Sequence, residues 1–302
     1  MRRAAASLCH SGDVVRIVHY NVRRCIDLEG LCSRKRILQT LARLQPTLVT
    51  LNEVDIRKTP TLLDDLSAEV GLVHGHFFGH VRDVYGNVMA SRLPLQLIEQ
   101  TKLRGGSMVQ IRNGTSHHIV RGMLSASIRV HGVDTRVAVT HLDHMSSAER
   151  RVQMNHVLQT LAESDDQQCL IMGDLNALGR ADYTSEQWIH HECYNRAKGW
   201  SAPVDELAAG GTLHMLQENR FVDAFAAMGQ RPHWQQPPWS AHTRDPERPS
   251  YRIDYAWTRA PSSNGGRRLV PLDAFVEFEC GAASDHQPIV LDFEATSFDA
   301  SE

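Results

Sequence analysis

Four acidic residues beside apolar, strand-like runs are the first candidates for chemistry: Glu53, Asp174, Asp254 and Asp285. A carboxylate at the end of a buried strand is costly to remove from water unless a positive partner compensates its charge. A hard divalent cation is such a partner, and oxygen-only ligands favour Mg²⁺, with Mn²⁺ as a substitute. Taken singly, each of these residues is more often a cap, a turn residue or an ion-pair partner, so the prediction rests on the group.

Two histidines stand in polar surroundings beside predicted strands. His141 precedes Asp143 by two residues, and His286 directly follows Asp285. A histidine near a carboxylate can be held as imidazolium, which neutralises an oxyanion or gives a leaving group its proton. Each histidine taken alone is more commonly a structural residue whose hydrogen bonds are satisfied.

The pattern of apolar residues predicts the elements that position these side chains. Apolar and β-branched runs predict strands over residues 14–22, 47–51, 120–130, 135–140, 169–172, 253–257, 274–278 and 289–293. Helical spacing predicts helices between Ser33 and Pro46 and over residues 60–70, 146–163, 183–197 and 213–219. The third of these helices begins with Ser146 and Glu149 at the spacing of a capping box.

At least five of the predicted strands end in or lie beside polar residues. These residues are Asn21, Asn52, Glu53, His141, Asp174, Asn176, Asp285 and His286. Apolar strands that deliver polar groups from their ends build a site at one edge of a sheet. The alternation of strands and helices, interrupted by a strand-rich middle, favours two layered sheets with outer helices over a doubly wound parallel sheet.

Seven short motifs then occur in one order along the chain. They are Tyr20-Asn21-Val22, Leu51-Asn52-Glu53-Val54, Tyr85-Gly86-Asn87-Val88-Met89-Ala90-Ser91-Arg92, Thr140-His141-Leu142-Asp143, Gly173-Asp174-Leu175-Asn176, Arg252-Ile253-Asp254-Tyr255 and Ser284-Asp285-His286-Gln287-Pro288. Over about residues 14–294 this series resembles the endonuclease/exonuclease/phosphatase superfamily, which has the DNase I-like fold. Any one motif is weak, but seven in the right order are specific.

The resemblance implies a four-layered α/β sandwich of two mainly antiparallel sheets flanked by helices. We expect one domain over residues 13–296, with terminal tails at 1–12 and 297–302. The resemblance also assigns the metal and the attacking water. Glu53 would hold Mg²⁺, with Asp285 as a second ligand and Asn21 near it. Asp174 would orient or deprotonate the water, and Asn176 would steady it.

The remaining implied roles concern the phosphate. His286 would contact the scissile phosphate and be oriented by Asp254, and His141 would contact the phosphate from the other side. Asn87 and Arg92 would shape the floor of the site and bind substrate. One departure from the family pattern is Asn52, since a glutamine often precedes the metal glutamate, so we expect altered hydrogen bonding there.

Other groupings of residues compete with this interpretation. His74, His76 and His80 invite a zinc site, but no cysteine is near them in sequence. Trp234 and Trp239 flank a proline-containing run and are candidates for stacking a base or another planar group of the substrate. The plainer interpretation of these two rings is that they anchor loops or the core.

Composition bounds the class of protein. The 302 residues carry a formal net charge of −3, which argues against a stoichiometric nucleic-acid binder and leaves open an enzyme with local basic patches. No window of 18 apolar residues predicts a membrane span. The six cysteines form no C-x-x-C pair and are typical of reduced thiols, so we expect a cytoplasmic protein with no evident partner protein.

The sequence thus predicts a Mg²⁺-dependent, nuclease-like enzyme that hydrolyses a phosphodiester by direct attack of water. Its partner would be a phosphate-ester substrate, with nucleic acid as one candidate. Two alternatives stay open: a phosphomonoesterase acting on an inositol, sugar or lipid phosphate, and a non-catalytic binding protein that retains the fold. The presence of Glu53, Asp174 and His286 together argues against the second.

Overall fold

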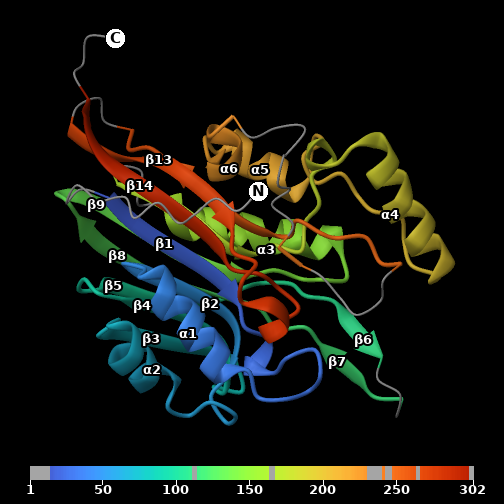
Figure 1. Cartoon of the computed structure of the whole chain (residues 1–302). Coiled ribbons are helices and arrows are strands. Elements are labelled where there is room, and N and C mark those ends of the chain that lie inside the picture. Colours follow the sequence, from blue (N-terminus) through green and yellow to red (C-terminus); the bar gives the residue numbers. More distant parts are fainter. Residues whose placement is uncertain are drawn as a thin grey trace.

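Two sheets packed face to face form the centre of the structure, and helices cover both outer surfaces (Figure 1). The computed structural model describes residues 14–110, 114–162, 167–229, 240–241, 247–262 and 266–298. Within these ranges each of the two sheets has six strands. The arrangement confirms the predicted four-layered α/β sandwich.

Each sheet is mainly antiparallel, as predicted. The first sheet has the spatial order β13 (Gly266–Val276), β14 (Ile289–Phe298), β1 (Val14–Asn21), β2 (Leu48–Asp55), β4 (Tyr85–Ser91) and β3 (His74–Val81). The second has the order β11 (Val222–Asp223), β12 (Asp254–Arg259), β10 (Gln168–Asp174), β9 (Val133–His141), β8 (Gly122–Val130) and β5 (Gln96–Lys102). Among the paired strands, only β1–β2 and β9–β10 run parallel within the described residues.

The helices of the described residues are α1 (Arg34–Leu44), α2 (Leu62–Asp65), α3 (Ser147–Leu161), α4 (Ser185–Ala197), α5 (Thr212–Glu218) and α6 (Ala224–Ala227). The short α6 contributes Ala224 and Phe225 to the core between the sheets. The apolar sides of α1 and α2 pack on the first sheet, and those of α3 and α5 on the second. A separate hairpin of β6 (Met108–Gln110) and β7 (Ser116–His118) projects from the layers (Figure 1). No helix in the described ranges has both the length and the apolar composition of a membrane span.

The space between the two sheets is apolar at one end and polar at the other. Successive residues of a strand point to opposite faces, so residues two apart share a face. Along β1, Ile17 lies in the inter-sheet core, whereas His19 and Asn21 contact polar groups of the second sheet. Along β10, Met172 lies in that core and Asp174 contacts Asn21. The site described below is therefore the polar end of the inter-sheet layer.

Two predicted helices differ from expectation, one along its length and one at its first turn. The structure replaces the predicted helix 60–70 with the short α2 and a π-helical turn over Leu66–Val70. Helix α3 begins after Ser146, whose Oγ accepts a hydrogen bond from the Glu149 amide at 3.3 Å. The Glu149 carboxylate does not complete the capping box, because it accepts from the Gly106 amide at 2.7 Å and so anchors the base of the β6–β7 hairpin.

Candidate active site

The ends of five strands, two in the first sheet and three in the second, bring the predicted polar residues together. In the parallel pair β1–β2, Asn21 lies opposite Asn52. In the second sheet Asp174 lies opposite His141 on one side and opposite Asp254 on the other. Because the two sheets pack face to face, these two rows meet across the inter-sheet layer. The polar groups at the predicted strand ends therefore lie together at one end of the inter-sheet layer.

Glu53 faces the site because strand β2 contains a bulge. Between Leu51 and Val54, β2 has one residue more than β4 opposite it. Glu53 is this extra residue, and its backbone is left-handed, at φ 59°. Regular alternation after the inward-facing Asn52 would turn Glu53 to the outer layer, and bulges commonly redirect a side chain in this way. The Asn21 Nδ2 donates to Glu53 Oε1 at 3.2 Å.

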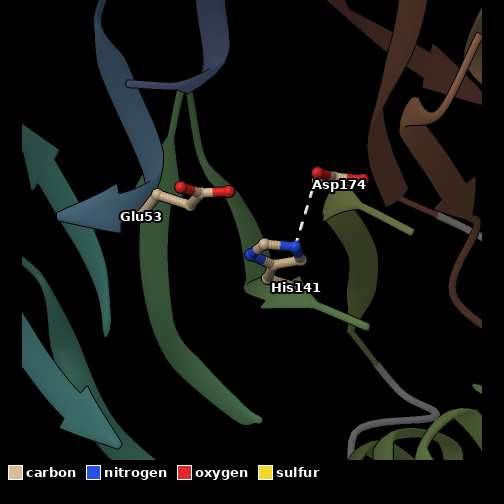
Figure 2. A group of neighbouring side chains, drawn as sticks. All are labelled: Glu53, His141 and Asp174. Atoms are coloured by element: carbon tan, nitrogen blue, oxygen red, sulfur yellow. Dashed lines mark ion pairs between the residues drawn. The ribbon is translucent and has the colours of Figure 1, made fainter. Parts of the chain in front are cut away.

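One oxygen of Asp174 is the centre of the site. Its Oδ2 accepts a hydrogen bond from Asn21 Nδ2 at 3.0 Å and lies 3.4 Å from His141 Nε2 and 3.6 Å from His286 Nε2. Its Oδ1 accepts from the Asn176 amide at 3.0 Å. Figure 2 shows His141 beside Asp174, with the Glu53 carboxylate facing the same space. The side-chain nitrogen atoms of Asn21, His141 and His286 thus converge on Asp174 Oδ2.

The electrostatic surroundings of Asp174 oppose its negative charge. Burial raises the pKa of its carboxyl to about 7, and the neighbouring carboxylates of Asp254 and Glu53 add to this increase, against the lowering effect of His286. A carboxyl group with a pKa near neutrality can both accept and release a proton at physiological pH. Perturbed values of this kind are concentrated at functional sites.

His286 and Asp254 form a buried ion pair. The His286 Nδ1 lies 2.7 Å from Asp254 Oδ2, and the Asp254 side chain is only 1% exposed. Burial by itself lowers the pKa of His286, but the charges of Asp254 and Asp174 outweigh it and hold that pKa well above its ordinary value. Burial likewise opposes the Asp254 charge, and His286 and His19 keep the pKa of Asp254 below its ordinary value. The predicted orientation of His286 by Asp254 agrees with this geometry.

His141 differs from His286 in its charge. Burial lowers the pKa of His141 well below its ordinary value, and Arg121 adds to this effect, so the ring is neutral. The Arg121 Nη1 lies 3.1 Å from His141 Nδ1, and its Nη2 lies 3.1 Å from His144 Nδ1. Since a guanidinium can only donate, His141 Nδ1 must accept and its proton must sit on Nε2. Arg121 therefore fixes the tautomer in which His141 presents a donor to the site.

Replacing Arg121 with methionine is expected to lower kcat about tenfold or more, because one hydrogen bond to a charged group is worth about 1.5–3 kcal/mol. The neutral His141 ring would then be free to adopt the other tautomer. Steady-state kinetics with a phosphodiester measure this effect. The control is Arg136→Met, since Arg136 is also buried in the second sheet but bonds to Glu99 and Ser125 instead. Equal losses of kcat in both variants would contradict the role of Arg121.

The loop after β10 is shaped by close backbone contact. A Cβ at Gly173 would lie 1.8 Å from the Thr140 carbonyl oxygen, so only glycine allows the approach that sets Asp174 beside His141. Asn176 adopts a left-handed backbone at φ 49°, and its Nδ2 donates to the Leu142 carbonyl at 3.2 Å. Asn176 thus ties the ends of β9 and β10 together.

Asn52 joins the two sheets beneath the site. Its Oδ1 accepts from the Asp174 amide at 2.9 Å, and its Nδ2 donates to Asn87 Oδ1 at 2.9 Å. Asn87 in turn donates to the Gly122 carbonyl at 2.8 Å and is fully buried. Asn87 therefore supports Asn52 from below, and its burial keeps it from the contact with substrate that the sequence predicted.

Two predicted site residues are not brought to the centre. The Asp285 carboxylate lies 3.4 Å from Arg23 Nε, is 37% exposed and belongs to neither metal-capable group among the described residues. Arg92 is placed away from the site, contrary to prediction, because β4 runs antiparallel to β2 and carries it to the opposite end of the sheet. There its guanidinium donates to the carbonyls of Pro46 and Val70.

The two tryptophans and the three histidines of the zinc interpretation are the remaining candidates. Trp234 and Trp239 lie outside the described residues. The zinc interpretation gains no support, since neither metal-capable group found within the described ranges contains His74, His76 or His80.

Sequence reasoning gave no role to three residues that contact the site: Tyr85, Arg121 and His19. The Tyr85 phenol hydrogen-bonds the Glu53 side chain, and burial raises its pKa, so it stays protonated. A histidine inside the buried run of β1 is the signal for His19, and an arginine directly before the buried run of β8 is the signal for Arg121.

The site can hold a divalent cation. Ligand atoms of Glu53, His141 and Asp174 all lie within 4.8 Å of one another, and because His141 Nε2 carries a proton, the carboxylate oxygens are the ligand atoms of this group. The two carboxylates are close enough that Glu53 disfavours the charge of Asp174. A cation between them would offset this repulsion, and carboxylates with an adjacent amide match the oxygen ligands that Mg²⁺ prefers.

The sequence pattern of the Endonuclease/Exonuclease/phosphatase family matches residues 18–286. The chain belongs to this family. The resemblance identified from the seven motifs is thereby confirmed. The family fold generally supports hydrolysis of phosphate esters, and its members generally use a divalent metal. A comparison with curated protein sequences found no significant match.

Solved structures of the same fold cover nearly the whole chain. An endonuclease/exonuclease/phosphatase from Beutenbergia cavernae superposes with a TM-score of 0.64 at 20% identity, over 93% of this chain and 72% of that one. D. rerio TDP2 complexed with single strand DNA product gives 0.59 at 20% identity, over 93% and 99%. The human Nocturnin catalytic domain with a bound sulfate anion gives 0.59 at 20% identity, over 94% and 95%. These similarities establish the fold.

Proposed function

We propose that this protein is a divalent-metal-dependent phosphodiesterase that cleaves its substrate by direct attack of water. The observation that carries the proposal is the convergence of Asn21, His141 and His286 on one oxygen of Asp174, beside Glu53. Hydrolysis of a phosphate ester needs an activated water, donors for the phosphoryl oxygens and compensation of developing charge. The residues of the site match each of these requirements.

Glu53 would hold the cation beside Asp174, with Mg²⁺ as the first choice and Mn²⁺ as its substitute. When bound, such an ion neutralises charge that develops on the phosphoryl group. Tyr85 and Asn21 both hydrogen-bond Glu53 and keep its carboxylate turned toward the site.

Asp174 orients the attacking water and accepts its proton. Its pKa of about 7 suits a general base, since the carboxylate is basic enough to take a proton and about half of the molecules are ionised at pH 7. Asn21 and the Asn176 amide fix the direction of the two carboxylate oxygens. A phosphodiester bound on the donors around Asp174 would thus meet a water in a fixed orientation.

The two histidines stabilise the phosphate in different ways. His286 is charged and can donate a proton from Nε2 to a phosphoryl oxygen or to the leaving oxygen. His141 is neutral and donates a hydrogen bond from Nε2 without changing its charge. When the P–O bond to the leaving group breaks, the negative charge that develops on the leaving oxygen is therefore neutralised by the His286 imidazolium.

A nucleic acid is the substrate class that we propose. D. rerio TDP2, which shares this fold, was crystallised with a single strand DNA product. Cys25, Cys32, Cys169, Cys193 and Cys280 are free thiols, which agrees with a reducing compartment such as the cytoplasm.

Hydrolysis of a panel of esters tests the proposal. We expect Mg²⁺- or Mn²⁺-dependent cleavage of a bis-aryl phosphodiester and of one or more of single-stranded DNA, abasic duplex, poly(A) and 5′-tyrosyl DNA ends, all abolished by a chelator. Purified Asp174→Asn protein controls for a contaminating enzyme. Faster hydrolysis of inositol phosphates or another monoester would replace the diesterase with a phosphomonoesterase. Binding of the esters without turnover would identify a non-catalytic member of the family.

A further inference from the structure

We propose that His19 is a positioning residue that fixes the Asp254 carboxylate and, through it, the ring of His286. The proposal rests on the phosphodiesterase function proposed above. His19, Asp254 and His286 would form one buried chain of hydrogen bonds that joins the two sheets. His19 touches neither substrate nor metal in this scheme.

The position of His19 follows from the alternation of β1. It lies two residues before Asn21 on the inward face, and its side chain is fully buried. Its Nε2 lies 3.3 Å from Asp254 Oδ1. Its Nδ1 lies 3.0 Å from the hydroxyl of Thr50, which is its register partner on β2.

The protons of this chain can be placed by elimination. Among the described residues, His19 Nε2 and Asp254 Oδ1 have no hydrogen-bond partner other than each other. A buried polar atom without a partner is destabilising, and an ionised carboxylate can only accept. His19 must therefore carry its proton on Nε2 and donate it to Asp254. In the ring that carries its proton on Nε2 alone, Nδ1 is an acceptor and the Thr50 hydroxyl is the donor.

This arrangement gives Asp254 one imidazole on each oxygen. His286 Nδ1 donates to Oδ2 at 2.7 Å, and His19 faces Oδ1. Two donors on opposite sides fix the rotation of the carboxylate about its Cβ–Cγ bond. Because His286 is oriented by the same carboxylate, its Nε2 is held toward Asp174 at 3.6 Å. Without His19, the carboxylate would lose one of these two constraints.

Kinetics of variants test the consequence. His19→Leu removes the donor at similar volume, and we expect kcat to fall about tenfold with KM little changed, since one oriented hydrogen bond is lost. His19→Gln keeps a terminal donor and should restore most of kcat. The matched control is Ile17→Val, on the same face of β1 but without polar contacts, which should lower stability and leave kcat unchanged. In an His286→Ala background, His19→Leu should cause no further loss.

Two results would overturn the proposal. One is a His19→Leu variant that loses thermal stability but keeps the wild-type kcat. The other is a loss of kcat that adds fully to that of His286→Ala.

A second measurement does not depend on turnover. The ¹⁵N shifts of the imidazole rings in wild-type protein, with His19 assigned through His19→Gln, should show a proton on His19 Nε2. An Nδ1–H tautomer would overturn the chain even in an active enzyme. The expected proton on Nε2 in a protein that hydrolyses no diester would support the chain and refute only the function.

Discussion

Replacing Asp174 with asparagine is expected to lower kcat by about 10²–10⁴-fold, the range for a positioned general base. The substitution is nearly isosteric, and the one oxygen of the new side chain can still accept a hydrogen bond from either the Asn176 amide or Asn21. The basic carboxylate is lost, together with one acceptor. Affinity for substrate should survive, because removal of one negative charge eases the approach of a phosphate. The measurement is kcat and KM at saturating Mg²⁺.

The stability of the same variant provides an internal control. The folded-state pKa of Asp174 is raised from 3.8 to about 7, so the folded protein binds a proton more tightly than the unfolded chain. Its ionisation therefore costs stability as pH rises from about 4 to about 7, and this cost persists above that window. Asp174→Asn removes the cost, so we expect an equal or higher Tm at pH 8. A rise in KM with an intact kcat would make Asp174 a binding residue and contradict the mechanism.

Replacing Glu53 with glutamine is expected to reduce activity by about 10²–10³-fold at limiting Mg²⁺, since a metal ion supplies several kcal/mol of charge stabilisation. The side chain keeps its size, and the bulge that aims it depends on the backbone, so the fold should persist. The apparent affinity for Mg²⁺ should fall in calorimetric titration as well as in assays of hydrolysis.

A carboxylate on the same strand serves as the control for Glu53. Asp55 lies two residues further along β2, but its carboxylate pairs with Arg57 at 2.8 Å. Asp55→Asn should leave the Mg²⁺ titration unchanged. If Glu53→Gln retained wild-type activity at low Mg²⁺, Glu53 would not be the metal ligand.

Local patterns in the sequence determined much of this structure. Period-two and period-3.6 patterns of apolar residues predict the order of the strands and helices along the chain. The cap at Ser146 and the polar residues at strand ends likewise depend only on residues close in sequence. Gly173 belongs to one of the seven motifs, and its close approach to Thr140 on β9 is a property of one backbone position. These features agree with the structure because each depends on few neighbours.

Tertiary packing decided how the site residues are aimed and paired. Glu53 enters the site only because β2 and β4 pair with a bulge, and Arg92 leaves it because β4 runs the other way. Arg121 and His19 acquire roles from partners far along the chain, His141 and Asp254. Strand alternation is set locally, whereas register, strand direction and contact between sheets depend on the whole sandwich closing around its core.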